Sequence, residues 1–381
     1  MQFIDLKAQY EVLKKDINNN IQSVLDSGQY MLGDFVRQLE KELADYVGVK
    51  YCVTCANGTD ALQLALMAWN IKAGDAVFVP SFTFYSTAEV VSILGATPIF
   101  VDTDPRTYNI DCDKLEKAIN QVIKDSKLNP KVIIPVDLFG QPANFERINE
   151  ISKKYNLLVL EDGAQGFGGS INGKMACSFG DIATTSFFPA KPLGCYGDGG
   201  AMFTNNEEYY NLLMSLRVHG KGTFKYDNIR VGMNSRLDTI QASILLPKLH
   251  AFKDYELRKR NAFATMYNKF LKDFVVTPLV PEEMISSWAQ YTILLNSNEE
   301  REYVQNKLRE QGIPTMIYYP TPLHRQTVYK EYDYNLSDLE ECERISKSCL
   351  SLPMHPYLDE NTVQLISNAL TNALGEFRNE K

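Results

Sequence analysis

The sequence predicts an α/β protein with a large domain over residues 1–245, built on a mostly parallel sheet, and a smaller C-terminal α+β domain over residues 246–381. Apolar, β-rich runs alternate with segments of helical periodicity through the first 240 residues. This pattern is typical of parallel strands whose connecting helices cover both faces of the sheet. The pattern changes after about Leu245, where a long charged helical stretch begins. A chain of 381 residues is also too long for one small core and suits two domains of unequal size.

The alternation in the large domain can be followed element by element. Its expected strands cover residues 51–54, 76–80, 98–101, 132–136 and 157–160, and another β-rich run begins at Thr184. Its expected helices cover residues 59–69, 113–123 and 144–154, with a further helical stretch that ends at Leu94. Because parallel sheets bind ligands outside the carboxyl ends of their strands, the residues that follow each run are the first candidates for a functional site.

The expected small domain begins with the charged helical stretch, which continues to about Phe274. It is followed by residues 290–295, by a helix near residues 299–311 and by the segment 315–319. This mixture of short apolar runs and helices indicates an α+β domain that closes on the large one.

Composition and charge exclude several classes of protein. The formal net charge is −8 at pH 7, whereas nucleic-acid binding requires clustered Lys and Arg. No uninterrupted run of 18 apolar residues could span a membrane, and residues 1–7 lack the basic and apolar stretches of a signal peptide. We therefore expect a cytoplasmic protein that binds neither nucleic acid nor membrane.

The seven cysteines are an odd number in a chain without an export signal, so we expect reduced thiols. Cys52 and Cys55 form a C-x-x-C pair, but no second Cys or His pair stands at zinc spacing. We interpret both as small buried residues near the end of a strand, and we expect no metal site.

The segment 56–62, with the sequence ANGTDAL, lies between an expected strand and an expected helix. Gly58 would let the backbone approach a ligand closely, and Thr59 offers a hydroxyl group at the start of the helix. The unpaired amides and the positive end of that helix would hold a phosphate. An ordinary turn with a helix cap uses the same residues, so this motif does not decide the function alone.

The apolar run 157–160 ends in two acids, Glu161 and Asp162. A pyridoxal cofactor needs a carboxylate at such a position, because its ring nitrogen must stay protonated for the ring to act as an electron sink. Asp162 is the candidate for this role, whereas Glu161 is expected to lie at a solvated strand end.

The segment around Lys191 is the most informative part of the sequence. Residues 184–194 read TTSFFPAKPLG and are followed by GDGG at 197–200. Most lysines are solvated surface charges, but prolines and glycines restrict the turn that contains this one. A lysine fixed after the carboxyl end of a strand is typical of a nucleophile that forms an imine with a carbonyl group.

Five strings in this order resemble the DegT/DnrJ/EryC1/StrS family of sugar aminotransferases: ANGTDAL (56–62), PSFTFYSTAE (80–89), LEDGAQ (160–165), SFFPAKPLGCYGDGG (186–200) and GMNSRLDTIQA (232–242). The resemblance extends from residues 3–6 to residues 352–356 and covers nearly the whole chain. It implies the type I aminotransferase fold and a homodimer with active sites at the subunit interface. It also implies pyridoxal 5′-phosphate as the cofactor, with pyridoxamine 5′-phosphate as its aminated form.

The resemblance also assigns roles to individual residues. Lys191 would bind the cofactor and move the proton between substrate and cofactor carbons, and Asp162 would contact the ring nitrogen. The other cofactor contacts would be Gln165 beside the ring hydroxyl, Phe84 on the ring face, and Gly58, Thr59 and Ser186 at the phosphate.

Residues outside these cofactor contacts receive roles as well. Asn234 matches the asparagine that the neighbouring subunit offers to the cofactor, although a cap on a helix beginning near Leu237 is the alternative interpretation. The expected substrate-binding residues are Arg236, Tyr318 and Tyr319. Gly163 stands where the family usually has alanine, a difference expected only to loosen the turn.

The segment around the lysine resembles the branch of the family that aminates carbon 3 of the sugar. The implied substrate is UDP-2-acetamido-2-deoxy-3-oxo-glucose or the corresponding 3-oxo-glucuronate, with glutamate as amino donor. The product would be a 3-amino sugar for cell-surface polysaccharide or lipopolysaccharide, such as O-antigen or lipid A. Enzymes acting on the uronate tend to have a histidine where this chain has Tyr318. Because the loss of a possible cation weakens the case for a carboxylated sugar, both substrates stay open with a slight preference for the neutral one.

Three alternatives remain beside this interpretation. The substrate could be a dTDP-linked 3-keto-6-deoxyhexose or a 4-keto sugar. A sugar dehydratase of the same family would have histidine in place of Lys191. A cofactor-binding regulatory protein of the same fold is the non-enzymatic alternative, but the sequence has no helix-turn-helix extension or basic region to support it.

Overall fold

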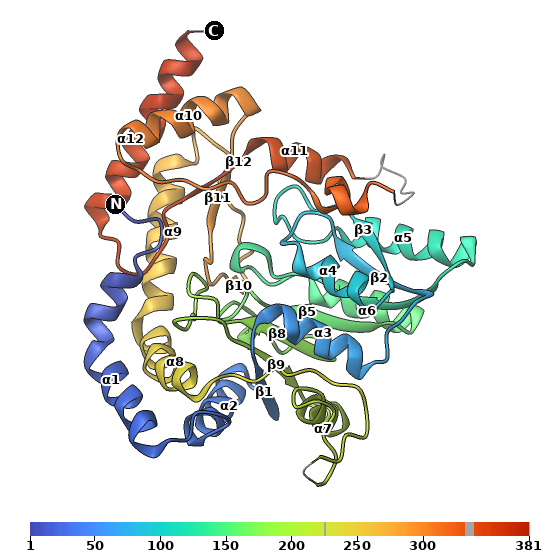
Figure 1. Ribbon diagram of the computed structural model, residues 1–381. Coiled ribbons are helices and arrows are strands. Elements are labelled where there is room, and N and C mark those ends of the chain that lie inside the picture. The colour runs from blue at the N-terminus through green and yellow to red at the C-terminus, as the bar shows by residue number, and fades with distance from the viewer. Residues whose placement is uncertain (225, 332–338, 381) are drawn as a thin grey trace.

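The computed structural model describes residues 1–224, 226–331 and 339–380, and a seven-stranded sheet forms its centre (Figure 1). The strand order is β1-β9-β8-β5-β4-β2-β3. Neighbouring strands from β8 to β3 are parallel, and β9 runs antiparallel to both of its neighbours. The prediction of an α/β fold with a mostly parallel sheet is therefore confirmed. The strands are β1 (Tyr51–Cys55), β2 (Asp75–Pro80), β3 (Thr97–Val101), β4 (Asn129–Ile133), β5 (Leu158–Asp162), β8 (Ile182–Ser186) and β9 (Gly200–Thr204).

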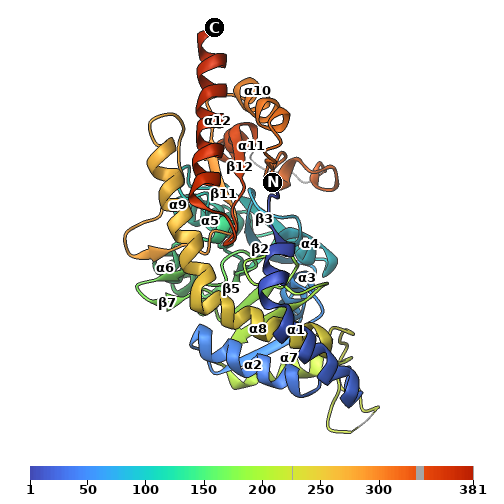
Figure 2. The same ribbon diagram turned by 90° about the vertical axis from the view of Figure 1, so that its left-hand side faces the viewer.

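Helices cover both faces of this sheet (Figures 1 and 2). Alternate residues of β2 show the division, because Val77 and Val79 belong to one apolar cluster while Ala76 and Phe78 belong to another. One face carries α3 (Gly58–Ala68), α4 (Ser86–Ile93) and α7 (Glu207–Leu216), and the other carries α2 (Asp34–Val47), α5 (Cys112–Asp125) and α6 (Phe145–Tyr155). No helix in the described part of the chain is long and apolar enough to cross a bilayer.

The predicted strand at 132–136 differs from the structure, where β4 ends at Ile133. The register between β2 and β4 shifts between Ala76 and Val77, so that Lys131 has no partner near the start of β4. The following residues stay extended, since Ile134 N donates to Phe78 O (2.8 Å) and Val136 pairs with Asp162 in an isolated bridge.

The charged stretch after Leu245 belongs to a longer helical rod. It consists of α8 (Thr239–Ala251), a π-helical turn η2 (Phe252–Glu256) and α9 (Leu257–Leu271). The first part packs against α1 (Leu6–Ser27) and α2, and the last part packs against α12 (Glu360–Asn379). Residue 245 thus lies inside a helix that both halves of the molecule share, and the domain limit at 245 stays a prediction.

The C-terminal part has an apolar core of its own, which includes Tyr267, Tyr291, Leu308, Leu352 and Leu370. Here β11 (Tyr291–Leu294) pairs with β12 (Cys349–Leu352), and α9, α10 (Asn298–Glu310) and α12 surround the pair. The segment 315–319 forms no named strand and is joined to β12 by a single bridge between Met316 and Ser351.

Short elements complete the described fold. Cys52 and Cys55 are buried in β1, which confirms their interpretation as small core residues. The remaining elements are the three-stranded sheet of β6 (Ser170–Ile171), β7 (Lys174–Met175) and β10 (Met284–Ile285), the 3-10 turns η1 (Leu138–Gly140), η3 (Leu323–Arg325) and η4 (Thr327–Tyr329), and the helix α11 (Glu340–Ser348).

Candidate active site

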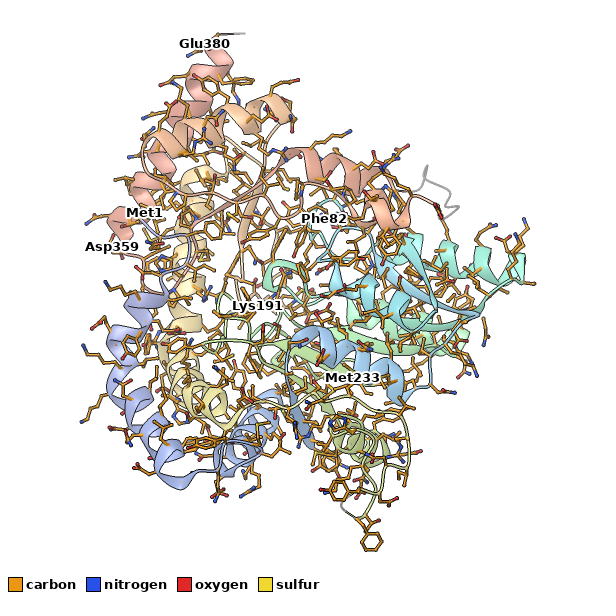
Figure 3. All side chains as sticks on the ribbon, viewed as in Figure 1. Met1, Phe82, Lys191, Met233, Asp359 and Glu380 are labelled. Carbon is orange, nitrogen blue, oxygen red and sulfur yellow. The ribbon has the colours of Figure 1, made fainter. Side chains whose placement is uncertain are left out.

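A cavity of about 860 Å³ opens at the carboxyl edge of the sheet, where the C-terminal part meets it. Figure 3 places Lys191 near the middle of the molecule, between the sheet and the C-terminal elements. Segments that lie far apart in the sequence converge here, as expected at the ends of parallel strands. The predicted site residues that line the cavity are Gly58, Thr59, Phe84, Asp162, Gln165, Ser186, Lys191, Tyr318 and Tyr319.

The start of α3 offers a place for a phosphate at one end of the cavity. Asn57 caps the helix by accepting from Asp60 N (2.7 Å), while the amides of Gly58 and Thr59 have no partners within the helix. A Cβ atom at Gly58 would lie 2.7 Å from the Cβ of Ser186, so glycine lets the end of β8 lie directly against the helix. Amides, hydroxyl groups and the positive helix end therefore converge there, and these groups fit a phosphate.

Asp162 is the last residue of β5, and its side chain is buried at the base of the cavity. Its carboxylate accepts hydrogen bonds from Thr87 Oγ1 (2.9 Å) and Ala164 N (3.2 Å). Burial raises the pKa of Asp162, while these two donors and the charge of Lys191 act in the opposite direction. A cation beside this carboxylate would replace the missing solvation, which fits the protonated ring nitrogen of a pyridoxal group.

Lys191 lies in a loop that closes on itself after β8. Phe187 N donates to Gly199 O (2.7 Å), Cys195 N donates to Phe187 O (2.8 Å), and Lys191 N donates to Phe188 O (2.9 Å). Burial lowers the pKa of the Lys191 ammonium group, and the charge of Asp162 partly opposes this shift. A lysine held in this way is more readily deprotonated and therefore more nucleophilic than a surface lysine.

Gln165 joins the loop after β5 to the C-terminal segment that carries Tyr319, across the cavity. Its Oε1 accepts from Phe139 N (2.8 Å), and its Nε2 donates to Tyr319 Oη (3.1 Å). The ring of Tyr319 also lies 6.4 Å, centre to centre, from the ring of Phe84. The two aromatic rings are tilted by 45° to each other, and with the amide they give the cavity a partly polar wall.

Two predicted residues, Asn234 and Arg236, do not line the cavity. Asn234 is exposed and pairs with Val218 in an isolated bridge, and Arg236 Nε is buried with no hydrogen-bond partner among the described residues. The alternative role of Asn234 as a helix cap is wrong, because α8 begins at Thr239 with Asp238 at its N-cap position. Neither predicted residue of the loop 232–236 therefore contributes to the lining of this chain's own cavity.

The expectation that Glu161 is solvated is wrong. Its side chain is fully buried, because β5 lies in the middle of the sheet and Glu161 points to the face opposite Asp162. There it accepts hydrogen bonds from Cys177 N, from Phe179 N (2.7 Å) and from Gly180 N (3.3 Å). Glu161 thus holds the loop before β8, a long-range role that a local strand pattern does not reveal.

The expectation that Gly163 merely loosens the turn is also wrong. A Cβ atom at this position would lie 2.6 Å from Cys177 Sγ and 3.0 Å from Thr184 O. The sulfur of Cys177 occupies the space that an alanine methyl group would need, so the glycine and the cysteine are a packed pair.

Thr87 is a contact of Asp162 that sequence reasoning missed. It lies three residues after Phe84 in the string at 80–89, a segment that the resemblance already assigned to the site. The hydrogen bond between Thr87 and Asp162 could not be predicted from the sequence, because these two residues are 75 positions apart.

Comparison with known proteins gives one consistent result. Residues 11–371 match the DegT/DnrJ/EryC1/StrS aminotransferase family. UDP-2-acetamido-2-deoxy-3-oxo-D-glucuronate aminotransferase of Pseudomonas aeruginosa is 48% identical, over 98% of this chain and 100% of its own length. UDP-N-acetyl-3-dehydro-alpha-D-glucosamine 3-aminotransferase of Acidithiobacillus ferrooxidans is 40% identical, over 97% of each chain. A solved DegT DnrJ EryC1 StrS aminotransferase from Brucella abortus has a TM-score of 0.96 and 49% identity, covering 98% of this chain and 100% of that one.

Proposed function

The chain belongs to the DegT/DnrJ/EryC1/StrS aminotransferase family, and from this premise we propose that it aminates the 3-keto group of a UDP-linked 2-acetamido sugar. It is a pyridoxal-phosphate-dependent nucleotide-sugar aminotransferase with the type I aminotransferase fold. The observation that carries the proposal is that Lys191 and the buried Asp162 line the same cavity at the carboxyl edge of the sheet, where the charge of each shifts the pKa of the other.

The residues that would hold the cofactor are those at the base of the cavity. Gly58, Thr59 and Ser186 would bind its phosphate, Asp162 its ring nitrogen and Gln165 its ring hydroxyl, and Phe84 would lie on the ring face. When bound, pyridoxal phosphate supplies an electron sink for the negative charge that develops as a proton leaves the substrate carbon.

Lys191 is the proposed acid–base group of the reaction. The lowered pKa of its amine makes the neutral form more accessible near neutral pH, so that Nζ can accept a proton and return it to the neighbouring carbon. Asp162, fixed by Thr87 and Ala164, would supply a preorganised negative charge that needs no rearrangement during the reaction.

Two relatives support the choice of sugar. The 48% identical protein is named for a 3-oxo-glucuronate and the 40% identical protein for the neutral 3-dehydro-glucosamine form. The uncharged phenol of Tyr318 on the cavity wall supports the neutral sugar, since a carboxylate is bound best by a charged donor. Glutamate is the proposed amino donor.

The charges of the cavity support a homodimer with shared active sites. Among the described residues that line it, Asp60, Asp162 and Asp198 are acidic and Lys191 is the single cation. A nucleotide diphosphate and a donor carboxylate need further cations, and Arg236 lies in a loop that leaves this chain's own cavity. We propose that this loop serves the cavity of a second copy. We also propose a cytoplasmic location, which the seven free thiols support.

The proposal is tested with a panel of UDP- and dTDP-linked 3-keto and 4-keto sugars, with glutamate as donor. Turnover should be fastest with the neutral UDP-2-acetamido-3-keto sugar, and the cofactor absorbance should change when glutamate is added alone. Faster turnover of a dTDP-linked or 4-keto sugar would refute the substrate assignment. A spectrum that glutamate and every other amino donor leave unchanged would support a binder rather than an enzyme.

A further inference from the structure

Two neighbouring strands end in residues that contact the C-terminal part rather than the cavity. Ser81 directly follows β2 and Asp102 directly follows β3. The strands are paired up to Pro80 and Val101, and Ser81 N donates to Val101 O (2.8 Å). Both side chains are fully buried, although serine and aspartate are polar, so their partners must satisfy them.

Ser81 is bound to the short helix η3. Its carbonyl oxygen accepts from Leu323 N (2.8 Å), and its Oγ lies 2.6 Å from Nδ1 of His324. The other ring nitrogen of His324 lies 3.1 Å from Glu343 Oε1, which also accepts from Arg325. A carboxylate can only accept hydrogen bonds. The neutral imidazole therefore donates from Nε2 to Glu343, and its Nδ1 accepts a hydrogen bond from the Ser81 hydroxyl group. Burial, the largest cause, lowers the pKa of His324 and favours this neutral form.

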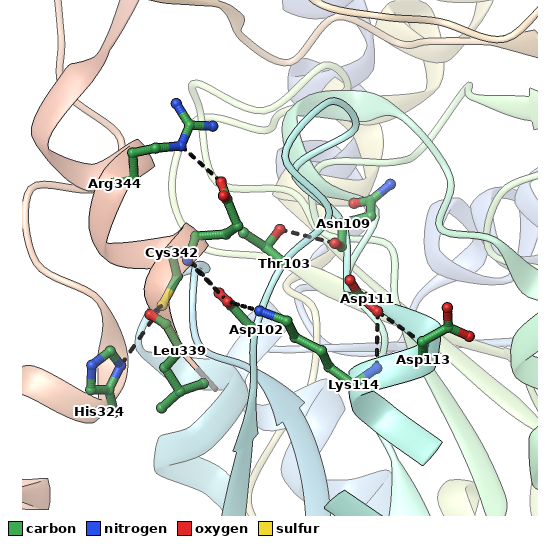
Figure 4. A network of polar contacts seen from close by, with 11 residues as sticks. Asp102, Thr103, Asn109, Asp111, Asp113, Lys114, His324, Leu339, Cys342 and Arg344 are labelled. Carbon is green, nitrogen blue, oxygen red and sulfur yellow. Dashed lines mark hydrogen bonds and ion pairs between the residues drawn. The ribbon is translucent and has the colours of Figure 1, made fainter. Parts of the chain in front are cut away.

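Asp102 caps the first turn of α11, a helix that begins 238 residues later in the chain and has no side-chain cap of its own. Its two oxygens accept from Cys342 N (2.7 Å) and Glu341 N (3.0 Å), and Lys114 Nζ lies 2.5 Å away (Figure 4). A carboxylate at a helix N-terminus is a favourable arrangement, and here it ties α11 to the end of β3.

These two anchors lie on either side of the segment that carries Tyr318 and Tyr319. On the first side, α11 leads directly into β12, where Ser351 exchanges two backbone hydrogen bonds with Met316 (2.8 and 3.1 Å). On the second side, the segment runs into η3, which Ser81 holds. The two tyrosines line the cavity between these points, whereas Ser81 and His324 do not line it.

We infer that Ser81 and His324 are positioning residues for substrate binding, because their contact fixes how far the segment with Tyr318 and Tyr319 lies from the base of the cavity. This inference rests on the proposed function for its substrate but not for its geometry. If the contact has a positioning role, its loss should weaken binding of the nucleotide sugar while the rate of the chemical step at Lys191 stays nearly unchanged. Mere core packing would instead predict a loss of folded protein with unchanged kinetics of the remainder.

Kinetics of Ser81→Ala test the inference. The variant should raise KM for the nucleotide sugar about 5- to 10-fold and leave kcat within about twofold, because the lost contact acts on binding. The matched control is Arg325→Gln, which removes an exposed partner of the same Glu343 but leaves the Ser81 contact intact, and its KM should stay at the wild-type value. An unchanged KM in Ser81→Ala, or a fall in kcat without a change in KM, would overturn the inference.

Two substitutions of His324 separate its contact with Ser81 from its contact with Glu343, and the Sγ of Cys342 lies farther away, 4.0 Å from Nδ1. In His324→Asn the side-chain amide can reach the position of Nδ1 and meet Ser81, whereas in His324→Gln it reaches the position of Nε2 and meets Glu343. KM should therefore stay closer to wild type in His324→Asn than in His324→Gln. The reverse order would show that the contact with Glu343, not the one with Ser81, holds the segment.

A readout without substrate keeps the inference separate from the proposed function. Hydrogen–deuterium exchange of peptides covering residues 316–326 should be faster in Ser81→Ala than in wild type, while peptides from α6 should exchange equally. Equal exchange at 316–326 would overturn the inference. If wild-type protein turned over no nucleotide sugar, the proposed function would fail and this measurement would still decide the positioning role.

Discussion

The base and the rim of the cavity are built in different ways. At the base, Asp162 and the Lys191 loop have their hydrogen-bond partners within residues 87–199 of the same chain. At the rim, Tyr319 comes from the C-terminal part and accepts a hydrogen bond from Gln165 Nε2, whereas Asn234 and Arg236 do not line this cavity. The groups proposed for the chemistry thus lie together in one chain, whereas the proposed recognition of the sugar nucleotide uses segments distant in the sequence and, in our proposal, a second copy of the chain.

The largest effect should come from replacing Lys191 at the base. Lys191→Ala should lower turnover more than about 10³-fold, because both the covalent attachment and the proton transfer depend on this amine. A coupled transamination assay measures the loss. Borohydride treatment of wild type, followed by mass spectrometry, should find the cofactor on the peptide that contains Lys191.

The control is Lys124→Ala, which changes an exposed lysine at the end of α5 and should leave turnover unchanged. Attachment of the cofactor to any other lysine would break the comparison, because the base of the cavity would then lack its central group.

The next largest effect should follow from Asp162→Asn. The amide oxygen can still accept from Ala164 N, and the amide NH2 can donate to Thr87 Oγ1, so the fold and much of the cofactor binding should persist. Turnover should fall at least about 10²-fold, since the ring nitrogen loses its counter-charge. Steady-state kinetics and the cofactor absorbance measure the two properties separately. Turnover near the wild-type value would assign the charge to another acid of the cavity, such as Asp198.

The base of the cavity could be predicted because its residues directly follow or precede the strands and helices that position them. Gly58, Asp162 and Lys191 each lie at or just beyond the carboxyl end of a strand, and the parallel arrangement brings such ends together. Five strings within the first 242 residues carried this information.

Contacts across long stretches of sequence could not be predicted in the same way. Glu161 was interpreted as solvated because its three amide partners belong to a loop 16 to 19 residues later. Asp102 anchors α11 through Glu341 and Cys342, which follow it by 239 and 240 positions in the sequence. No local pattern indicates contacts over such a separation. The proposed role of Arg236 rests on a contact with another chain, which a pattern within one sequence does not indicate.

The third prediction tests the rim directly by mixing two inactive chains. The Lys191→Ala chain lacks the amine in its own cavity. The Asn234→Ala chain lacks the side chain that its loop would offer to the partner's cavity. Random assortment makes half of the dimers mixed, and each mixed dimer has one intact site, so up to about a quarter of wild-type activity should return. If exchange of subunits is confirmed and no activity returns, the loop does not serve the partner's cavity.

The smallest effect concerns the turn that follows Asp162, where Gly163 packs against Cys177. Gly163→Ala should lower the free energy of unfolding by about 1–3 kcal/mol, because the new methyl group overlaps the sulfur of Cys177. Cys177→Ala removes that sulfur, so the double variant should be more stable than the sum of the two single changes predicts. Urea denaturation of the wild type, both single variants and the double variant measures this coupling. Additive effects would show that Thr184 O, the other close neighbour of the added methyl group, is the atom that excludes a side chain at position 163. The packing of Gly163 against Cys177 would then not determine the shape of the cavity base beside Asp162.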